Sequence, residues 1–374
     1  MRFLSAGESH GWGISSIIEG MPAGMPLSEN DIDKDLKRRM AGYGRSERMK
    51  IESDTAQIVS GLYKGKTTGS PLAILIRNVD SRDLSDPDAH PFLIPRPGHA
   101  DLAGSLKYNH TDMRAVSERT SARETAGRVA VGAVMKRLLS YFNIEFIGFV
   151  VDIGGMKVKT GREKISDIRE AVEISTIRCP DIRAEEKIRS LIEETSAEGD
   201  SLGGIFTVVI EGVPPGLGSF AHWDRKLDAR LAAALMSIPA VKGVEIGEGF
   251  HQAGMPGSKV HDEIYWQEGF KRKTNRAGGL EGGVSNGEPI ILRAVMKPIP
   301  TIKKPLNSVN IATKEAAKSQ YQRADVCAVP AASVIGEAVC AWAIAEAFLE
   351  KFCPDTLSDL KDSYSHYMKR IKEF

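Results

Sequence analysis

Cysteine is scarce in this chain, and the four that occur follow no pattern typical of disulfides or metal sites. Cys179, Cys327, Cys340 and Cys353 form no CxxC pair and share no framework spacing. Disulfide scaffolds and zinc sites both need regularly spaced cysteines. The eight histidines likewise lack HExxH or zinc-ligand spacing. We therefore expect free thiols in a reducing cytoplasm and no bound metal.

An excess of charge and long apolar runs are missing as well. The 50 Lys and Arg residues nearly balance 49 Asp and Glu residues, which gives a net charge of +1. A general nucleic-acid-binding domain is expected to be strongly basic, so this class is disfavoured. The N-terminus MRFLSAGESHG has no signal-peptide core, and no run reads as long enough to cross a membrane. We expect neither nucleic acid nor a membrane as a partner.

Two standard nucleotide-binding loops are also absent. No complete GxGxxG motif follows a predicted strand, and no Walker loop occurs. A standard Rossmann or P-loop fold is therefore not supported. The length of 374 residues, 42% of them hydrophobic, is enough for a large core in one large domain or two to three smaller ones.

What is present is an internal repeat. Residues 7–24, GESHGWGISSIIEGMPAG, match residues 199–216, GDSLGGIFTVVIEGVPPG, at eight of 18 positions. Residues 61–74 match 279–292 in the same order along the chain. A third match aligns Tyr108-x-His110-x-Asp112 with Tyr321-x-Arg323-x-Asp325. Three matches in one order predict an internal duplication.

The duplication predicts the fold class. Each copy contains a glycine-rich turn, a β-rich run and an amphipathic helix candidate. One helix is capped by Ser28, and the apolar stripe of the other is formed by Trp223, Leu227, Leu231 and Leu235. Short turns between strand candidates favour antiparallel pairing. We expect an α+β protein whose halves, about 1–150 and 199–374, pack about a pseudo-two-fold axis. The connector 151–198 is charged and helical in character and suggests no chemistry.

One stretch combines reactive and anion-binding groups with a helix. Residues 107–139 begin with His110, Asp112 and several arginines, and continue as a helix of small residues, with Ser117 or Thr120 as its predicted N-cap. A helix start and arginines both favour a bound anion. A solvated charged face remains the alternative interpretation.

His10, His110 and Asp325 are the candidates for proton transfer. His10 lies in a tight glycine-flanked turn, where a structural role is the more frequent one. Asp325 in its turn could be an ordinary ion-paired residue. The repeat should bring the loops bearing His110 and Asp325 together near the pseudo-axis. The residues themselves thus indicate a polyanion-binding enzyme with histidine acid–base groups, without indicating its reaction.

Three motifs in these segments resemble the chorismate synthase family. The first is Gly7-Glu8-Ser9-His10-Gly11 with Ile17-Ile18-Glu19-Gly20. The second is Glu118-Arg119-Thr120-Ser121-Ala122-Arg123-Glu124-Thr125. The third is Arg323-Ala324-Asp325-Val326-Cys327-Ala328-Val329-Pro330. RPGHAD at 96–101 and MSIPAVKGVEIG at 236–247 add support, although Pro239 stands where many members have Asn. The resemblance covers nearly the whole chain.

The resemblance implies a reaction, cofactors and a fold. The reaction is the 1,4-elimination of phosphate from 5-enolpyruvylshikimate 3-phosphate to give chorismate, a lyase step of the shikimate pathway of aromatic amino acid biosynthesis. It requires reduced FMN without net redox change, and NADPH is the electron source in members that reduce their own flavin. The implied fold is a single-domain β-α-β sandwich over 1–374, with helices between two antiparallel sheets, assembled as a homotetramer.

The resemblance also implies roles for individual residues. His10 would protonate the departing phosphate, His110 would contact the reduced flavin near N1 and O2, and Asp325 would assist proton movement at N5. Substrate anions would be bound by Ser9, Arg39, Arg45, Arg48, Arg123 and Arg323. The flavin-binding positions would be Arg119, Thr120, Ser121, Ala122, Pro239, Ala240, Gly282, Lys297, Pro298, Ile299, Pro300, Thr301 and Arg323.

Two other functions remain open at this stage. A flavin oxidoreductase or NAD(P)H-dependent flavin reductase could use the same site, but the sequence has no clear nicotinamide motif. A non-catalytic polyanion- or RNA-binding module would retain the arginines but would not explain the paired histidines or Asp325.

Overall fold

The computed structural model describes residues 1–45, 53–86, 90–159, 165–322 and 324–374. Within them two larger antiparallel sheets form. The first has the order β1-β2-β6-β3 and the second has the order β10-β15-β9-β7-β8. Their strands are β1 (Arg2–Ala6), β2 (Gly13–Glu19), β3 (Ala56–Ser60), β6 (Leu72–Arg77), β7 (Glu145–Ile153), β8 (Met156–Lys157), β9 (Gly204–Glu211), β10 (Val241–Ile246) and β15 (Ile290–Met296).

Short two-stranded hairpins form in addition to these sheets. They are β4 (Leu62–Tyr63) with β5 (Lys66–Thr67), β11 (Ile264–Trp266) with β12 (Phe270–Arg272), β13 (Leu280–Glu281) with β14 (Val284–Ser285), and β16 (Asn307–Val309) with β17 (Ala316–Lys318). The β4–β5 hairpin precedes β6, just as β13–β14 precedes β15. The order β1-β2-β6-β3 thus has the same connectivity pattern as β7-β9-β15-β10.

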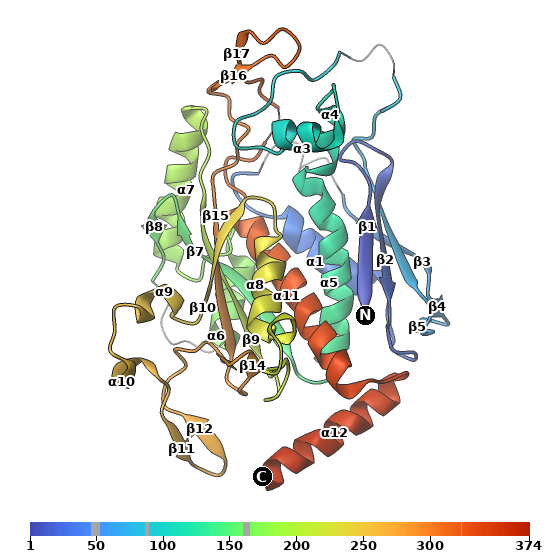
Figure 1. The fold of residues 1–374 in the computed structure, drawn as a ribbon, viewed down its shortest axis with the longest axis vertical. Helices are drawn as coiled ribbons and strands as arrows, with labels where there is room; N and C mark the ends of the chain where they lie inside the picture. Colours follow the sequence, from blue (N-terminus) through green and yellow to red (C-terminus); the bar gives the residue numbers. More distant parts are fainter. Residues whose placement is uncertain (46–52, 87–89, 160–164, 323) are drawn as a thin grey trace.

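Helices fill the space between the two sheets (Figure 1). α1 (Glu29–Met40) and α5 (Thr125–Ser140) pack on the first sheet, and α8 (Leu227–Met236) and α11 (Val329–Phe352) pack on the second. The remaining helical segments are α3 (Asp101–Tyr108), α4 (Arg114–Arg119), η1 (Ala122–Glu124), α6 (Ile165–Ile174), α7 (Ile182–Ala197), η2 (Trp223–Arg225), α9 (Gly249–Gln252), α10 (Gly257–Val260) and α12 (Leu357–Glu373). The α+β class predicted from the sequence is confirmed.

α5 and α11 approach each other closely because small residues line their contact. A Cβ atom added to Gly132 of α5 would lie 2.3 Å from Cβ of Ala338 on α11. The helices' backbones are therefore close enough that no side chain fits at position 132. α11 is also the one helix in the described residues that is long and apolar enough to cross a membrane, which corrects the sequence expectation. Since 89% of its apolar window is buried in protein, α11 forms part of the core.

Local sequence signals explain where several helices begin. Ser28 is the N-cap of α1 as predicted, and the Asp31 carboxylate accepts a hydrogen bond from its backbone N–H at 2.9 Å. The predicted N-cap of the helix after residue 107 was wrong. Ser117 lies inside α4 and Thr120 follows it, while Ser121 caps η1, which leads directly into α5. The stretch is thus broken into three helical pieces.

One further expectation needs correction. Trp223 does not belong to the apolar stripe of α8, because it lies in η2 and its side chain is exposed. β7, which includes residue 150, pairs with β9 of the second sheet. The connector does contain the expected helices, α6 and α7.

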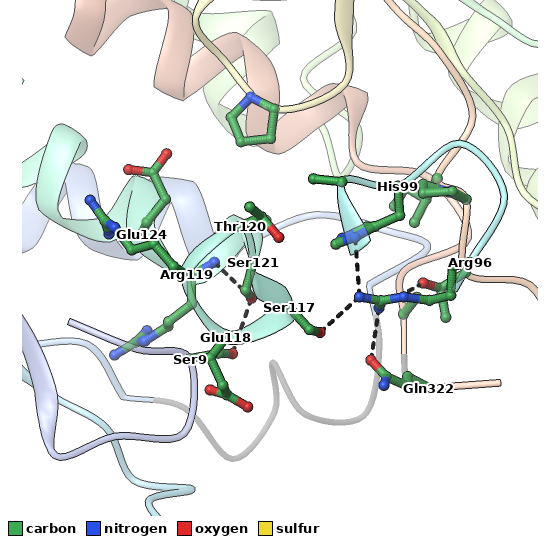
Figure 2. A pocket seen from close by; sticks show the side chains of 18 of the residues that line it. Ser9, Arg96, His99, Ser117, Glu118, Arg119, Thr120, Ser121, Glu124 and Gln322 are labelled. Carbon is green, nitrogen blue, oxygen red and sulfur yellow. Dashed lines mark hydrogen bonds between the residues drawn. The ribbon is translucent and has the colours of Figure 1, made fainter. Parts of the chain in front are cut away.

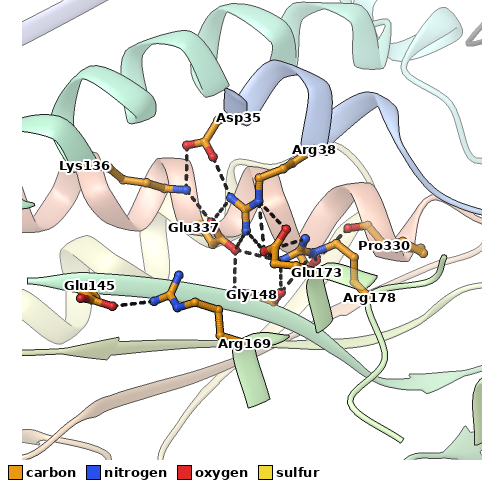
Figure 3. A network of polar contacts seen from close by, with 11 residues as sticks. Asp35, Arg38, Lys136, Glu145, Gly148, Arg169, Glu173, Arg178, Pro330 and Glu337 are labelled. Atoms are coloured by element: carbon orange, nitrogen blue, oxygen red, sulfur yellow. Dashed lines mark hydrogen bonds and ion pairs between the residues drawn. The ribbon is translucent and has the colours of Figure 1, made fainter. Parts of the chain in front are cut away.

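A buried polar network connects α1, α5 and α11 (Figure 3). Glu337 of α11 is completely buried. Its carboxylate accepts hydrogen bonds from Arg38 of α1 at 2.7 Å, from Arg178 at 3.2 Å and from the backbone N–H of Gly148 in β7 at 2.7 Å, and it also pairs with Lys136 of α5. Three cations and a backbone donor therefore satisfy one carboxylate.

Two further carboxylates offset the positive charge of this network. Asp35 of α1 pairs with Arg38 at 2.7 Å and with Lys136 at 2.8 Å, and Glu173 of α6 pairs with Arg38 at 2.7 Å. Arg38 points into this network, whereas its neighbour Arg39 bonds Asp54 and Thr125. The network thus fixes the orientation of the helix that carries Arg39.

Candidate active site

A cavity of about 1360 Å³ lies where α5 begins, and it collects segments from both halves of the chain. Ligand sites for one small molecule typically occupy about 300–1,000 Å³, so this cavity has room for two. Its lining comes from the β1–β2 loop, the end of α1, residues in 80–100, the α4–α5 junction, residues 238–242, residues 296–301 and residues 320–328.

His10 is held in the cavity by a carboxylate from α4. Its Nδ1 lies 2.8 Å from Oε1 of Glu118, and its backbone N–H donates to Oε2 of the same residue at 2.7 Å. Nε2 lies 3.8 Å from Oδ2 of Asp80. An Nδ1–H donated to Glu118 leaves Nε2 as the atom that can exchange a proton with a ligand.

The turn before His10 depends on glycine. Gly7 has φ +125°, and a Cβ atom there would lie 2.2 Å from the carbonyl oxygen of Gly13. This close turn brings the buried Ser9 hydroxyl to 3.0 Å from that of Ser121 at the start of η1. The first two motifs, separated by more than a hundred residues, therefore meet through paired hydroxyl groups.

Three arginines and Asp325 line a second part of the cavity wall, and Asp54 pairs with two of these arginines. Asp54 bonds Arg39 at 3.2 Å and Arg123 at 2.5 Å, while Asp325 bonds Arg45 at 2.8 Å. Burial lowers the pKa of Arg39 to about 10, and the positive charges of Arg45 and Arg123 add to this effect against the attraction of Asp54 and Asp325. The cluster has one more cation than anions, so a bound anion would stabilise it.

The donors of these arginines are fixed by neighbouring groups. Nε of Arg39 donates to Oγ1 of Thr125 at 3.0 Å, and Nε of Arg123 donates to Oδ1 of Asn78 at 2.7 Å. Nε of Arg45, in contrast, is buried and has no hydrogen-bond partner in the described parts of the chain. A buried N–H without an acceptor is costly, and a ligand oxygen would satisfy it.

Arg96 connects three segments that line the cavity (Figure 2). It bonds Asp101 at the start of α3, Ser117 of α4 at 2.7 Å and Gln322 at 2.7 Å, and it also reaches Thr301 at 3.3 Å. These contacts hold the loop before α3 and the segment 297–322 against α4. Segment 297–322 therefore lies as an arm along the cavity.

The structure brings most of the predicted site residues together. On the cavity lie Ser9, His10, Arg39, Arg45, Arg119, Thr120, Ser121, Ala122, Arg123, Pro239, Ala240, Lys297, Ile299, Pro300, Thr301 and Asp325. Pro298 does not line the cavity but connects two residues that do. Arg48 and Arg323 lie outside the described residues.

Two predicted residues are not on this cavity. His110 is exposed just after α3, and Gly282 lies in the turn of the β13–β14 hairpin. The expected meeting of His110 with Asp325 is therefore not seen within one copy of the chain. The repeat places the two residues in matching loops, His110 opposite Arg323 and Asp325 opposite Asp112, but of the two only Asp325 lines the cavity.

Sequence reasoning gave no role to several residues that shape the site. Glu118 stands at the start of the second motif, so its position there was the available signal. Asp54 and Asn78 belong to none of the three family motifs, and only folding brings them to Arg123. Such partners carry no local signal because the contact is made across distant parts of the chain.

Comparisons with known proteins agree on one family. The family model described as chorismate synthase matches residues 1–349. The chain is 52% identical over 376 residues to chorismate synthase from Caldanaerobacter subterraneus, covering 100% of both chains. It is 50% identical to the protein of that name from Aquifex aeolicus, covering 100% of this chain and 99% of the relative. A solved structure entitled "Crystal Structure of Chorismate Synthase" superposes with a TM-score of 0.82 at 44% identity, covering 100% of this chain and 98% of that one.

Proposed function

The chain belongs to the chorismate synthase family, and we propose that the cavity described above is the site of its reaction. The enzyme converts 5-enolpyruvylshikimate 3-phosphate to chorismate and phosphate, a lyase step of the shikimate pathway. The observation that carries the placement is the convergence of His10, Ser9 and the arginine cluster on one cavity. We propose that these residues bind the substrate and transfer protons during the elimination.

Arg39, Arg45 and Arg123 bind the negative charges of the substrate. The substrate carries two carboxylates and a phosphate, and guanidinium groups bind such groups through charge-assisted hydrogen bonds. The buried Nε of Arg45 supplies a donor that is not already used by the described residues. The substrate would thus complete the charge balance around Asp54 and Asp325.

His10 acts as the general acid for the departing phosphate. Glu118 holds Nδ1, so the proton that reaches the phosphate comes from Nε2. Protonation lowers the negative charge on the leaving group and makes its departure easier. A general acid placed in this way typically contributes about 10²–10⁴-fold to the rate. The hydroxyl groups of Ser9 and Ser121 lie beside His10 and can orient a phosphate oxygen.

Reduced FMN fits the remaining part of the cavity. The cavity volume exceeds that expected for one ligand. The proposed flavin-binding residues on the cavity are Arg119 to Ala122, Pro239, Ala240, Lys297 and Ile299 to Thr301. When bound, the flavin supplies reversible electron donation to the substrate. Asp325 is placed to move a proton beside it while paired with Arg45. NADPH is the proposed electron source for the flavin.

His110 and Gly282 need a separate proposal because neither lines this cavity. Their roles in flavin contact rest on the family resemblance alone. We expect His110→Ala to lower turnover by about 10²–10⁴-fold if it acts as an acid–base group. Near-normal turnover would remove His110 from the mechanism.

We also infer an internal duplication within a β-α-β sandwich. The matching connectivity of β1-β2-β6-β3 and β7-β9-β15-β10 supports it, as do the hairpins that precede β6 and β15. We further propose that the enzyme is cytoplasmic and assembles as a homotetramer, as the family implies. Light scattering during size-exclusion chromatography would check the oligomeric state.

An anaerobic assay tests the proposed reaction. The enzyme is mixed with 5-enolpyruvylshikimate 3-phosphate and dithionite-reduced FMN, and phosphate release and chorismate absorbance are followed. Product without net flavin oxidation is expected. No product from folded, flavin-bound enzyme would favour a flavin oxidoreductase instead. Repeating the assay in air with NADPH tests whether the enzyme reduces its own flavin.

A further inference from the structure

His99 is one of three histidines on the cavity wall, together with His10 and His90. It lies in the loop before α3, and its side chain is only 16% exposed. The ammonium group of Lys297 donates to the carbonyl oxygen of the adjacent Gly98. The ring therefore sits where the loop before α3 meets the arm that begins at Lys297.

Arg96 and Asp101 determine which ring nitrogen of His99 carries the proton. Nδ1 of His99 lies 2.6 Å from Oδ1 of Asp101 and 3.2 Å from Nη2 of Arg96. Nη2 has two N–H bonds, and it already donates to Asp101 at 2.8 Å and to Ser117 at 2.7 Å. With no N–H of Arg96 left for it, Nδ1 donates its own hydrogen to Asp101.

Asp101 is a strong acceptor for this hydrogen bond. It is completely buried, and burial alone would raise its pKa. Hydrogen bonds from Arg96 and His99 outweigh that effect and hold the pKa of Asp101 well below its usual range. A permanently charged acceptor keeps Nδ1 protonated and the ring in one orientation.

In the imidazole form with its hydrogen on Nδ1, Nε2 is the hydrogen-bond acceptor of the ring. It makes no hydrogen bond with any residue that the structure describes, and it is not among the fully buried polar atoms that lack a partner. An acceptor that is oriented by a buried carboxylate and open to the cavity is suited to a ligand N–H group. A solvent-exposed histidine would not need such support.

The position of His99 favours the flavin over the substrate. Arg96 fixes the ring and also contacts Thr301 in the proposed flavin-binding segment. In Figure 2, His99 lies apart from Thr120 and Ser121, which belong to another segment proposed to bind the flavin. The arginines proposed for the substrate belong to the cluster around Asp54 and Asp325.

We propose that His99 contacts the flavin, with Nε2 accepting a hydrogen bond from an N–H group of the isoalloxazine ring. This inference rests on the proposed flavin requirement. Flavin carries a ring N–H in both its oxidised and its reduced form, so the contact does not depend on the redox state. His99 would then determine specificity for the flavin, in addition to the flavin-binding segments that the family resemblance implies.

Two substitutions separate a ligand contact from a structural role. His99→Asn keeps an amide N–H near the position of Nδ1 and so retains the bond to Asp101, but it has no group at Nε2. His99→Gln places its amide near Nε2 but gives up the bond to Asp101. Binding of oxidised FMN, and anaerobically of reduced FMN, is measured by fluorescence quenching without substrate or turnover.

We expect His99→Asn to bind FMN about 3- to 10-fold more weakly, as for one lost hydrogen bond. His99→Gln should bind within about 2-fold of the unsubstituted enzyme, because a polar group returns to the Nε2 position. Stabilisation by inorganic phosphate, read from the melting temperature, should be unchanged in both variants.

Unchanged FMN binding in His99→Asn would overturn the inference. Equal weakening in both variants would also overturn it, because the Nε2 position would then not matter. Should His99→Asn fail to fold, restored binding in His99→Gln supports the contact and weakened binding opposes it. If the unsubstituted enzyme binds no FMN, the proposed flavin requirement fails instead, which is a distinct result.

Discussion

Nδ1 of His10 lies 2.8 Å from Oε1 of Glu118, although 108 positions separate the two residues in the chain. The same carboxylate accepts the backbone N–H of His10 at 2.7 Å. One side chain of α4 therefore fixes both the ring and the turn that carries it. The proposed general acid thus depends on a partner from another motif.

Replacing His10 by Asn should lower kcat about 10²–10⁴-fold while the protein still folds, because the group that protonates the phosphate is lost. Phosphate release under anaerobic conditions measures the effect. His222→Asn is a matched control, since that histidine pairs with Asp224 at 2.7 Å but is exposed and does not line the cavity. Equal activity of both variants would exclude His10 as the acid.

Replacing Arg45 by Ala should raise KM for 5-enolpyruvylshikimate 3-phosphate by about 10- to 100-fold, because charge-assisted hydrogen bonds to the substrate are lost. Steady-state kinetics measure this change. Arg183→Ala on the exposed face of α7 removes the same charge away from the cavity and should leave KM unchanged. A similar rise in both variants would point to overall charge rather than to Arg45.

Replacing Glu337 by Gln should lower the free energy of unfolding by about 3–5 kcal/mol, because Arg38, Lys136 and Arg178 would remain buried without their shared carboxylate. Urea unfolding followed by circular dichroism measures the loss. Glu170→Gln on the exposed surface of α6 is the control. A loss below about 1 kcal/mol would mean that the network contributes little to stability.

Acid should weaken the fold through the same residue. Burial raises the pKa of Glu337, but Lys136, Arg38 and Arg178 outweigh it and hold the pKa far below the ordinary value of 4.5. The unfolded chain therefore binds this proton first, so the stabilisation is complete above about pH 5 and is lost progressively as pH falls below about 4.5. Unfolding free energies at a series of pH values should show a steeper acid loss in the unsubstituted enzyme than in Glu337→Gln.

Replacing Gly132 by Ala should destabilise the protein, although alanine is the better helix former by about 1 kcal/mol. The added methyl would lie 2.3 Å from Cβ of Ala338, so α5 and α11 would have to separate. Overpacking of this kind costs about 1–3 kcal/mol. A raised melting temperature would show that the two helices can move apart without cost.

The sequence identified those features that depend on neighbouring residues. The repeat located β2 and β9, Ser28 marked the start of α1, and the motifs identified part of the cavity wall. Pairings across the fold could not be read in this way. Asp54 reaches Arg123 over 69 positions, and no local pattern distinguishes it from any other aspartate.

The site prediction was limited for a similar reason. Matching loops of a repeat need not line the same cavity, as the loops bearing His110 and Asp325 illustrate. A residue can also have a larger part in the site than the neighbouring sequence indicates. The sequence indicates no role for His99, yet Asp101 and Arg96 hold it on the cavity.

The bond between Arg38 and Glu337 spans 299 positions of the chain. During synthesis on the ribosome, the first sheet, α1 and α5 emerge long before α11, which covers their apolar faces and neutralises Arg38. The nascent chain therefore carries an incomplete core until its last quarter has left the exit tunnel. Contacts of such sequence separation slow folding and expose apolar surface meanwhile. The order of synthesis thus makes α11 the element that completes the fold.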